Sequence, residues 1–115
     1  MRAYIAVKFH VDNRNRDQIE QISRFLDKAG IESVCIARDY EKWGQIQFDP
    51  CELMQLAFHQ IDSSDCLIVD LTEKGVGIGI EAGYAFAKKI SIITIAHKGS
   101  EISDSLQGIT SQLFL

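Results

Sequence analysis

The chain has 115 residues, of which 46% are hydrophobic and 24% charged, and its formal net charge at pH 7 is −4. This length and composition are typical of a soluble globular protein, and we predict one domain over residues 1–115. The sequence has no basic stripe and no apolar run of the roughly 20 residues that span a bilayer. We therefore expect neither a nucleic acid polymer nor a membrane as a partner.

The cysteines and the N-terminal residues favour a cytoplasmic location. The three cysteines include no CxxC pair, and Cys35 and Cys66 lie in apolar runs, where small core residues are expected. The first residues have neither the long apolar stretch nor the cleavage site of a secretory signal. The three histidines lack metal-ligand spacing, so we expect no metal and no other cofactor.

The first half of the chain predicts a strand, a helix and a second strand. Residues 4–7 form a short apolar run between polar neighbours, as in a buried strand. Asp12 or Asn13 is suited to cap a helix whose apolar residues recur at helical spacing until Gly30, a typical stop signal. Residues 33–37 predict the second strand.

Residues 38–48 have mixed charge and weak periodicity, which predicts a long loop. Long loops in compact domains are often functional, so this segment is a candidate lid or specificity element. Tyr40, Trp43 and Phe48 would either stack on the ring of a ligand or pack the loop onto the domain.

The second half begins with a strong helix start. Asp49 is suited to the cap, Pro50 to the first helical position, and Glu52 completes a capping box. The remaining predicted elements are a strand at 66–69, a helix at 79–89, a strand at 90–95, a helical turn at 103–108 and a short strand at 113–115. This order predicts an α/β fold, a flavodoxin-like or Rossmann-like three-layer sandwich with a mostly parallel sheet of about five strands.

In a flavodoxin-like strand order of 2-1-3-4-5, ligands bind where the first and third strands end. Lys8, Phe9 and His10 follow the first strand, and Asp70 ends the third. The loop glycines, which are Gly75, Gly77 and Gly79, permit positive φ and a close approach of the backbone to a ligand. The run is not a Walker phosphate loop, because no Lys-Ser/Thr pair follows it.

Glu81 is a single acidic residue in an uncharged run, and we place it in the first turn of the helix after Gly79. The helix N-terminus favours the ionised carboxylate, whereas burial among apolar neighbours raises its pKa. The sequence leaves both outcomes open. It also leaves open the alternative that Glu81 merely complements the helix dipole.

Three segments resemble the nucleoside 2-deoxyribosyltransferase family: Tyr4-Ile-Ala, residues 64–72 and residues 77–85. The form Gly-x-Gly-x-Glu-x-Gly is similar to the branch of deoxynucleoside 5′-monophosphate N-glycosidases. The resemblance implies that Glu81 attacks the anomeric carbon of a deoxyribose and forms a covalent glycosyl-enzyme. It also implies that Tyr4 orients Glu81, although Tyr4 is equally explained as a core aromatic residue.

The resemblance further implies a homo-oligomer with a shared site, in which Ser103 of a neighbouring subunit holds a phosphate. Ser105 is a nearby possibility, and a helix-capping role is the alternative for Ser103. Apolar surface for such an interface is expected from Phe58 and from residues 113–115.

Two positions depart from the family pattern. The acid/base aspartate expected in the second helix is replaced by Ala57. Glu52, His59 and Asp70 are the available substitutes, of which we prefer Asp70 as a sugar or proton-transfer contact. In the first loop, Val7 replaces a glycine of the phosphate-binding segment, which leaves Lys8 or His10 to supply a cation.

These patterns favour an enzyme that cleaves or transfers the N-glycosidic bond of a small-molecule (deoxy)nucleoside or nucleoside monophosphate. Hydrolysis and transfer differ only in the acceptor, and the sequence does not separate them. The alternative is a non-catalytic nucleotide-binding or sensor domain, which Ala57 favours. A flavodoxin-like response domain is disfavoured because no acidic pair follows the first strand.

Overall fold

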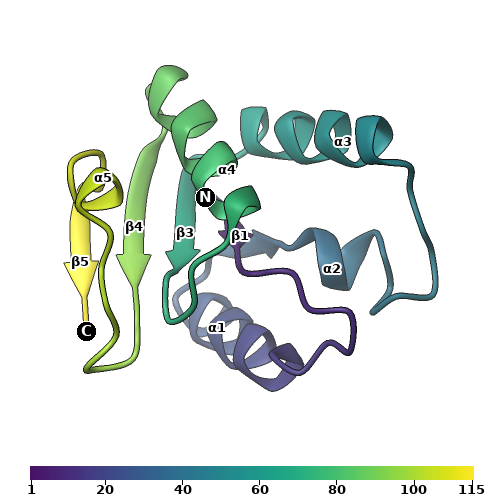
Figure 1. Ribbon diagram of the computed structural model, residues 1–115, viewed down its shortest axis with the longest axis horizontal. Helices are drawn as coiled ribbons and strands as arrows, with labels where there is room; N and C mark the ends of the chain where they lie inside the picture. The colour runs from purple at the N-terminus through teal and green to yellow at the C-terminus, as the bar shows by residue number, and fades with distance from the viewer.

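The computed structural model describes residues 1–115 and contains one five-stranded, all-parallel sheet with the order β2-β1-β3-β4-β5 (Figure 1). The strands are β1 Arg2–Ala6, β2 Glu32–Val34, β3 Cys66–Asp70, β4 Ser91–Ile95 and β5 Gln112–Phe114. The helices are α1 Arg16–Lys28, α2 Ile36–Asp39, α3 Pro50–Asp62, α4 Val76–Ala87 and α5 Asp104–Gln107. The predicted flavodoxin-like α/β class is confirmed, and the strand order is the flavodoxin-like one considered above. None of the helices is long and apolar enough to cross a membrane.

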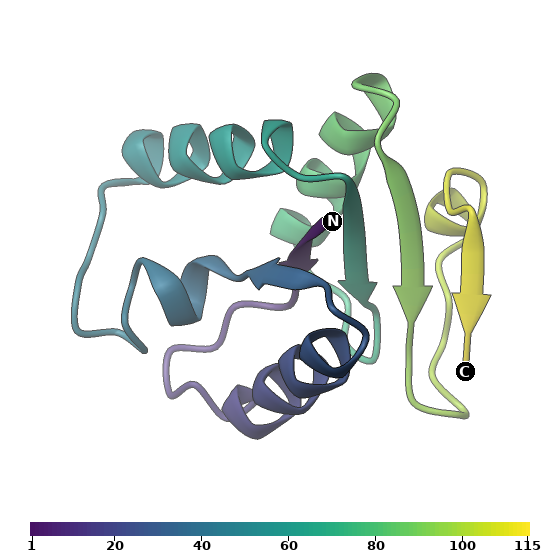
Figure 2. The same ribbon diagram turned by 180° about the vertical axis from the view of Figure 1, so that it is seen from behind.

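Helices cover both faces of the sheet, with α1 on one side and α3 and α4 on the other (Figures 1 and 2). Alternation along β1 divides its side chains between these faces. Tyr4 packs in the larger core cluster with residues of α3 and α4, whereas Ala3 and Ile5 lie in two smaller clusters against α1. The register of β1 therefore directs Tyr4 toward the same layer as α4.

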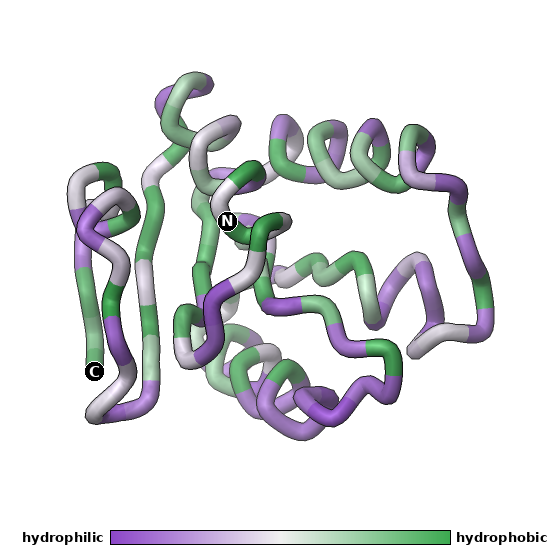
Figure 3. Tube along the Cα trace, viewed as in Figure 1, coloured by the Kyte–Doolittle hydropathy of each residue, from purple (hydrophilic) through white to green (hydrophobic).

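The central strand β3 is buried along its whole length, as expected for a parallel strand covered on both faces. Figure 3 shows hydrophobic residues along β3 and β4 and hydrophilic ones on the outer side of α1. Cys66 and Cys35 are both buried, which confirms the prediction that they are core residues.

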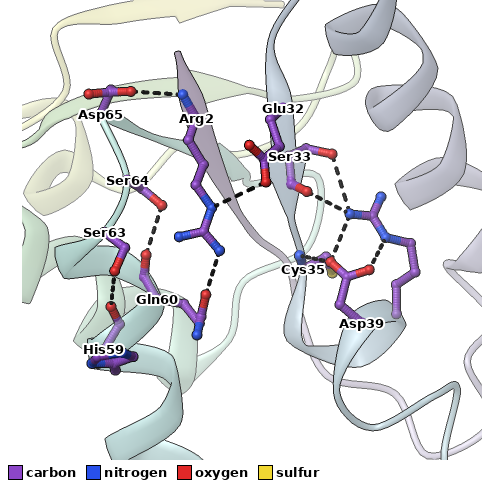
Figure 4. Close-up of polar contacts among 11 residues, drawn as sticks. Arg2, Glu32, Ser33, Cys35, Asp39, His59, Gln60, Ser63, Ser64 and Asp65 are labelled. Atoms are coloured by element: carbon purple, nitrogen blue, oxygen red, sulfur yellow. Dashed lines mark hydrogen bonds and ion pairs between the residues drawn. The ribbon is translucent and has the colours of Figure 1, made fainter.

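The region after β2 differs from the prediction of a strand over 33–37. β2 ends at Val34, and the short helix α2 follows almost at once. The backbone N–H of Cys35 donates to the carboxylate of Asp39 at 2.9 Å, which favours a helical turn directly after the strand (Figure 4). The loop prediction for residues 38–48 therefore holds only after this helix.

The start of α1 also differs from the prediction. The helix begins at Arg16, and its cap position is Asn15, so neither Asp12 nor Asn13 caps it. The Asn15 side chain instead donates to the carbonyl oxygen of Lys8 at 2.9 Å. Asn13 has a φ of 54° and donates to the carbonyl oxygen of Trp43 at 3.0 Å. These residues thus hold the loops around the carboxyl end of β1.

The predicted start of α3 is confirmed, because Asp49 accepts a hydrogen bond from the Glu52 N–H at 2.9 Å and Pro50 is the first helical residue. The predicted exposure of Phe58 is wrong. Its ring stacks on Tyr84 with a centroid distance of 4.2 Å and packs against the larger core cluster. Phe58 therefore joins α3 to α4 within the chain.

Candidate active site

A cavity of roughly 290 Å³ lies at the carboxyl end of β1, between this strand, α3 and the start of α4. Its volume approaches the lower end of the range for small-molecule sites. Thirteen of its 21 lining residues are hydrophobic. Its polar residues include Tyr4, Lys8, His10, Glu41 and Glu81. The cavity is thus an apolar hollow with a few convergent polar groups, as is typical of ligand sites.

Tyr4 and Glu81 meet inside this cavity. The Tyr4 hydroxyl donates a hydrogen bond to Oε2 of Glu81, joining residues 77 positions apart in the sequence. Tyr4 is almost completely buried, with 1% of its surface exposed, and its phenol pKa is raised by burial and by the charge of Glu81. Tyr4 is therefore both a core aromatic residue and a neutral donor that fixes the Glu81 carboxyl.

The surroundings of Glu81 decide between the two opposing effects considered above. Because α4 begins at Val76, Glu81 lies in the second helical turn, not in the first turn as predicted. The helix dipole weakens beyond the first turn. Burial raises the pKa of the Glu81 carboxyl to about 7, although the Tyr4 hydrogen bond acts in the opposite direction. A carboxyl with this pKa titrates near neutral pH, as groups that transfer protons or act as nucleophiles often do.

Lys8, Phe9 and His10 all line the cavity, as predicted for a segment that follows β1. His10 lies 2.5 Å from the carboxylate of Glu73. Lys8 has no ion-pair partner, and Phe9 is 67% exposed. Lys8 is therefore a cation at the cavity that has no ion-pair partner within the protein.

The glycines are arranged differently from the prediction. Gly75 is the cap residue of α4 with an extended φ of −157°, and Gly77 and Gly79 lie within the helix. None of the three has a positive φ, so the backbone here does not use the conformational freedom that glycine permits. Gly75 and Gly77 line the cavity with Glu81, whereas Gly79 does not.

Asp70 is not brought together with Glu81. It lines a separate cavity of roughly 240 Å³ that has no hydrophobic lining residue. Its carboxylate accepts hydrogen bonds from the Gln18 side chain and from the Thr72 N–H, the latter at 3.0 Å. Lys8 lines both cavities, because the segment that follows β1 runs between them. Asp70 is thus a satisfied, buried carboxylate on the other side of this segment.

Ser103 is also separated from Glu81 within the chain. It lines a third cavity, of roughly 190 Å³, together with Ser105 and Gly79. Ser103 occupies the cap position of α5, but its side chain makes no capping hydrogen bond.

Sequence reasoning missed Glu41, whose side chain lines the Glu81 cavity. The signal for it was weak, because Glu41 is one of two acidic residues in the loop predicted over residues 38–48. The aromatic residues of that loop do not line the cavity. Tyr40 packs against the larger core cluster, and Trp43 packs near Ile5 under the guanidinium of Arg16, 4.6 Å from its ring centroid. For these two residues the packing alternative is confirmed.

Known proteins with this fold include enzymes that act on nucleosides. No protein-family model and no curated protein sequence matches the chain. The solved structure of the CMP N-glycosidase BcmB from Clostridium botulinum is 20% identical, with a TM-score of 0.68, over 100% of this chain and 87% of that one. A 2-deoxyribosyltransferase from Bacillus psychrosaccharolyticus is 13% identical, with a TM-score of 0.80, over 100% and 86%.

The same fold also carries other functions. A response regulator, TrrA from Thermotoga maritima, is 18% identical, with a TM-score of 0.61, over 100% of this chain and 86% of that one. At these identities the similarity establishes the fold alone, so function has to be argued from the site.

Proposed function

We propose that this protein cleaves or transfers the N-glycosidic bond of a (deoxy)nucleoside or nucleoside monophosphate through a covalent glycosyl-Glu81 intermediate. The observation that carries the proposal is the Tyr4–Glu81 hydrogen bond inside an apolar cavity. The similarity in fold to an N-glycosidase and a deoxyribosyltransferase supports the same choice of reaction.

In this proposal Glu81 is the nucleophile and Tyr4 its orienting residue. The buried phenol remains protonated, so its O–H holds one carboxylate oxygen while the other is left to attack the anomeric carbon. Nucleophilic attack requires the ionised carboxylate. The rate is therefore expected to rise as the pH increases through about 7, the pKa of Glu81.

The walls of the cavity suit a nucleoside. Leu53, Met54 and Ala57 of α3 present apolar surface suited to the flat face of a base. The ammonium of Lys8 is the group available for a 5′-phosphate. Asp70 faces a different cavity and accepts hydrogen bonds from Gln18 of α1 and from the Thr72 N–H, so we assign it a structural role there, not proton transfer.

We further propose a homo-oligomer in which Ser103 serves the site of a neighbouring subunit. Ser103 and Glu81 of one chain line different cavities, which is compatible with such sharing. Light scattering at micromolar concentration tests the assembly, and a monodisperse monomer would contradict it. Mixing Ser103→Ala and Glu81→Ala chains tests the sharing, because only a shared site regains activity on mixing.

The central experiment is the release of free base from a panel of deoxynucleosides, nucleosides and their monophosphates, measured by chromatography. Glu81→Gln preserves the size of the side chain and is expected to lower the rate at least 10³-fold. Rapid acid quench and intact-mass measurement test for a glycosyl adduct on the wild-type protein, absent from Glu81→Gln. Glu32→Gln, at an exposed carboxylate on β2, is the matched control. Base release that persists in Glu81→Gln would rule out Glu81 as nucleophile.

A second candidate function is a nucleotide-binding or sensor domain without catalysis. It is favoured by Ala57, which lines the cavity at the position where the resembling family has its acid/base aspartate. Ligand-induced thermal stabilisation without base release across the whole panel would favour this candidate.

A further inference from the structure

We propose that Glu41 is the general acid/base of this site, protonating the departing base and then activating the acceptor. This inference rests on the proposed function and assigns to this chain the proton-transfer role that Ala57 leaves vacant. Glu41 lines the same cavity as Glu81 and Tyr4.

The carboxyl of Glu41 has no partner within the protein. No hydrogen bond or ion pair reaches it, although the side chain lines the cavity and is partly buried. Asp39, two residues earlier, is different: Arg38 donates to it at 2.8 and 2.9 Å, and the Cys35 N–H also donates to it. A partly buried carboxyl without a partner in a ligand cavity is available to a ligand, whereas Asp39 is used in holding α2.

Burial in the cavity favours the protonated form of Glu41 relative to the same group in water. Burial raises the pKa of its carboxyl. The negative charge of Glu41 also contributes to the raised pKa of the Tyr4 phenol, after burial and the effects of Glu81, so the two side chains interact. The other titratable groups lining the cavity are Lys8, His10, Cys35 and Glu81. Two carboxyls in one apolar cavity favour a state in which they share one proton, and the reaction uses the form in which Glu41 holds this proton and Glu81 is ionised.

The backbone around Glu41 is fixed firmly. Its N–H donates to the carbonyl oxygen of Ile36 at 2.9 Å, and its own carbonyl accepts from the N–H groups of Gly44 at 3.0 Å and Ile46 at 2.9 Å. The next residues, Lys42 and Trp43, have φ values of 50° and 57°, a backbone conformation that residues other than glycine rarely adopt. Two contacts hold this unfavourable conformation. The Trp43 ring packs against the core, and the Asn13 side chain donates a hydrogen bond to the backbone carbonyl of Trp43.

An ionised Glu81 oxygen forms a bond to C1′, the C1′–N bond breaks with its electron pair going to the base, and the Glu41 proton moves to that base. In the second step the Glu41 carboxylate takes a proton from water or from an acceptor base. That acceptor bonds to C1′, and the electron pair of the C1′–O bond returns to Glu81.

The test varies the basicity of the departing base, because only a loss of proton transfer by Glu41 should depend on this basicity. Wild type and Glu41→Gln are compared on deoxynucleosides whose bases differ in basicity, including an N-methylated base that departs neutral without protonation. We expect kcat/KM of Glu41→Gln to fall 10²–10⁴-fold on ordinary bases and only a few-fold on the pre-methylated base. Glu81→Gln loses activity on all of them, and Glu32→Gln retains it.

A parallel loss across the whole series, or no loss in Glu41→Gln, would overturn the role of Glu41 while leaving the proposed function standing. Absence of base release by wild type on every substrate would overturn both. If Glu41→Gln has a lowered melting temperature, Glu41→Ala with added formate is the second variant. Restoration of activity by this small acid supports proton transfer, and failure of rescue in a folded variant contradicts it.

Discussion

Glu81 and Asp70 are carboxylates close to the same end of the sheet, yet their surroundings are opposite. Asp70 ends β3 and is buried among polar groups, where Gln18 and the Thr72 N–H donate to it. Glu81 faces an apolar cavity with one hydrogen bond, from Tyr4, and burial raises its pKa to about 7. Burial alone thus does not prepare a carboxylate for chemistry. The number and kind of its hydrogen-bond donors decide whether it is held as structure or left poised to react.

The largest expected difference between the two carboxylates is in activity. Glu81→Gln should reduce the first-order rate of base release at least 10³-fold, which corresponds to about 4 kcal/mol of transition-state free energy. Asp70→Asn should change that rate less than tenfold. Single-turnover measurements with both variants provide the comparison, and equal losses would erase the distinction drawn between the two residues.

The second difference is in the pH dependence of stability. The pKa of Glu81 rises from an ordinary 4.5 to about 7 on folding, so the native protein binds this proton more tightly than the unfolded chain does. Its contribution to stability is fully present below about pH 4.5 and is lost as the pH rises through 7. At 1.36 kcal/mol per pKa unit, Glu81→Gln should therefore gain about 2.5 kcal/mol in stability relative to wild type between pH 5 and pH 8. Urea unfolding at both pH values measures this gain, and parallel stability curves would contradict the assignment.

The third prediction concerns Asp70 as a structural residue. Replacing it with alanine leaves the Gln18 amide and the Thr72 N–H without their acceptor in a buried site. We expect a loss of about 1–3 kcal/mol in the free energy of unfolding. The measurement is the urea midpoint at pH 7, with Asp12→Ala as an exposed control. A change no larger than that of the control would show that Asp70 is not a structural carboxylate.

The smallest effect is expected for Tyr4→Phe, which keeps the ring and removes the hydroxyl. Without its donor the pKa of Glu81 should rise further, because the Tyr4 hydrogen bond is the influence that lowers it. We expect a fall of about tenfold in rate at pH 7, from the loss of roughly one hydrogen bond. The acid limb of the pH–rate profile should also move to higher pH. A lowered rate with an unmoved limb would show that Tyr4 acts on the substrate rather than on Glu81.

Much of the fold was predictable because apolar runs and caps act locally. The run that became β3 and the Asp49-Pro50 start of α3 both depend on neighbours within a few residues. The prediction errors lie where contacts between residues outside the local segment determine its structure. Asp39 reaches back to the Cys35 N–H and ends β2 early, and the glycines after position 75 enter a helix because that helix packs on the sheet.

The candidate site was predictable for a different reason. Residues at the carboxyl ends of parallel strands converge by topology, so the placement of Lys8, Phe9 and His10 at this cavity could be predicted from position alone. The meeting of Glu81 with Tyr4 follows from the alternation of β1. The separation of Asp70 and the presence of Glu41 were not predictable, because both depend on how the segments after β1 and α2 pass over the sheet.

Helix α4 has a consequence for how the protein folds. Gly77, Gly79 and Gly83 lie within it in ordinary helical conformation, and a Cβ at any of them would meet nothing within 4 Å. Each glycine weakens a helix by about 1 kcal/mol relative to alanine, so the segment has little tendency to be helical by itself. It acquires its shape from packing against the sheet and α3. The segment that carries Glu81 should therefore order only with the rest of the domain, so that partially folded chains hold no preformed Tyr4–Glu81 pair.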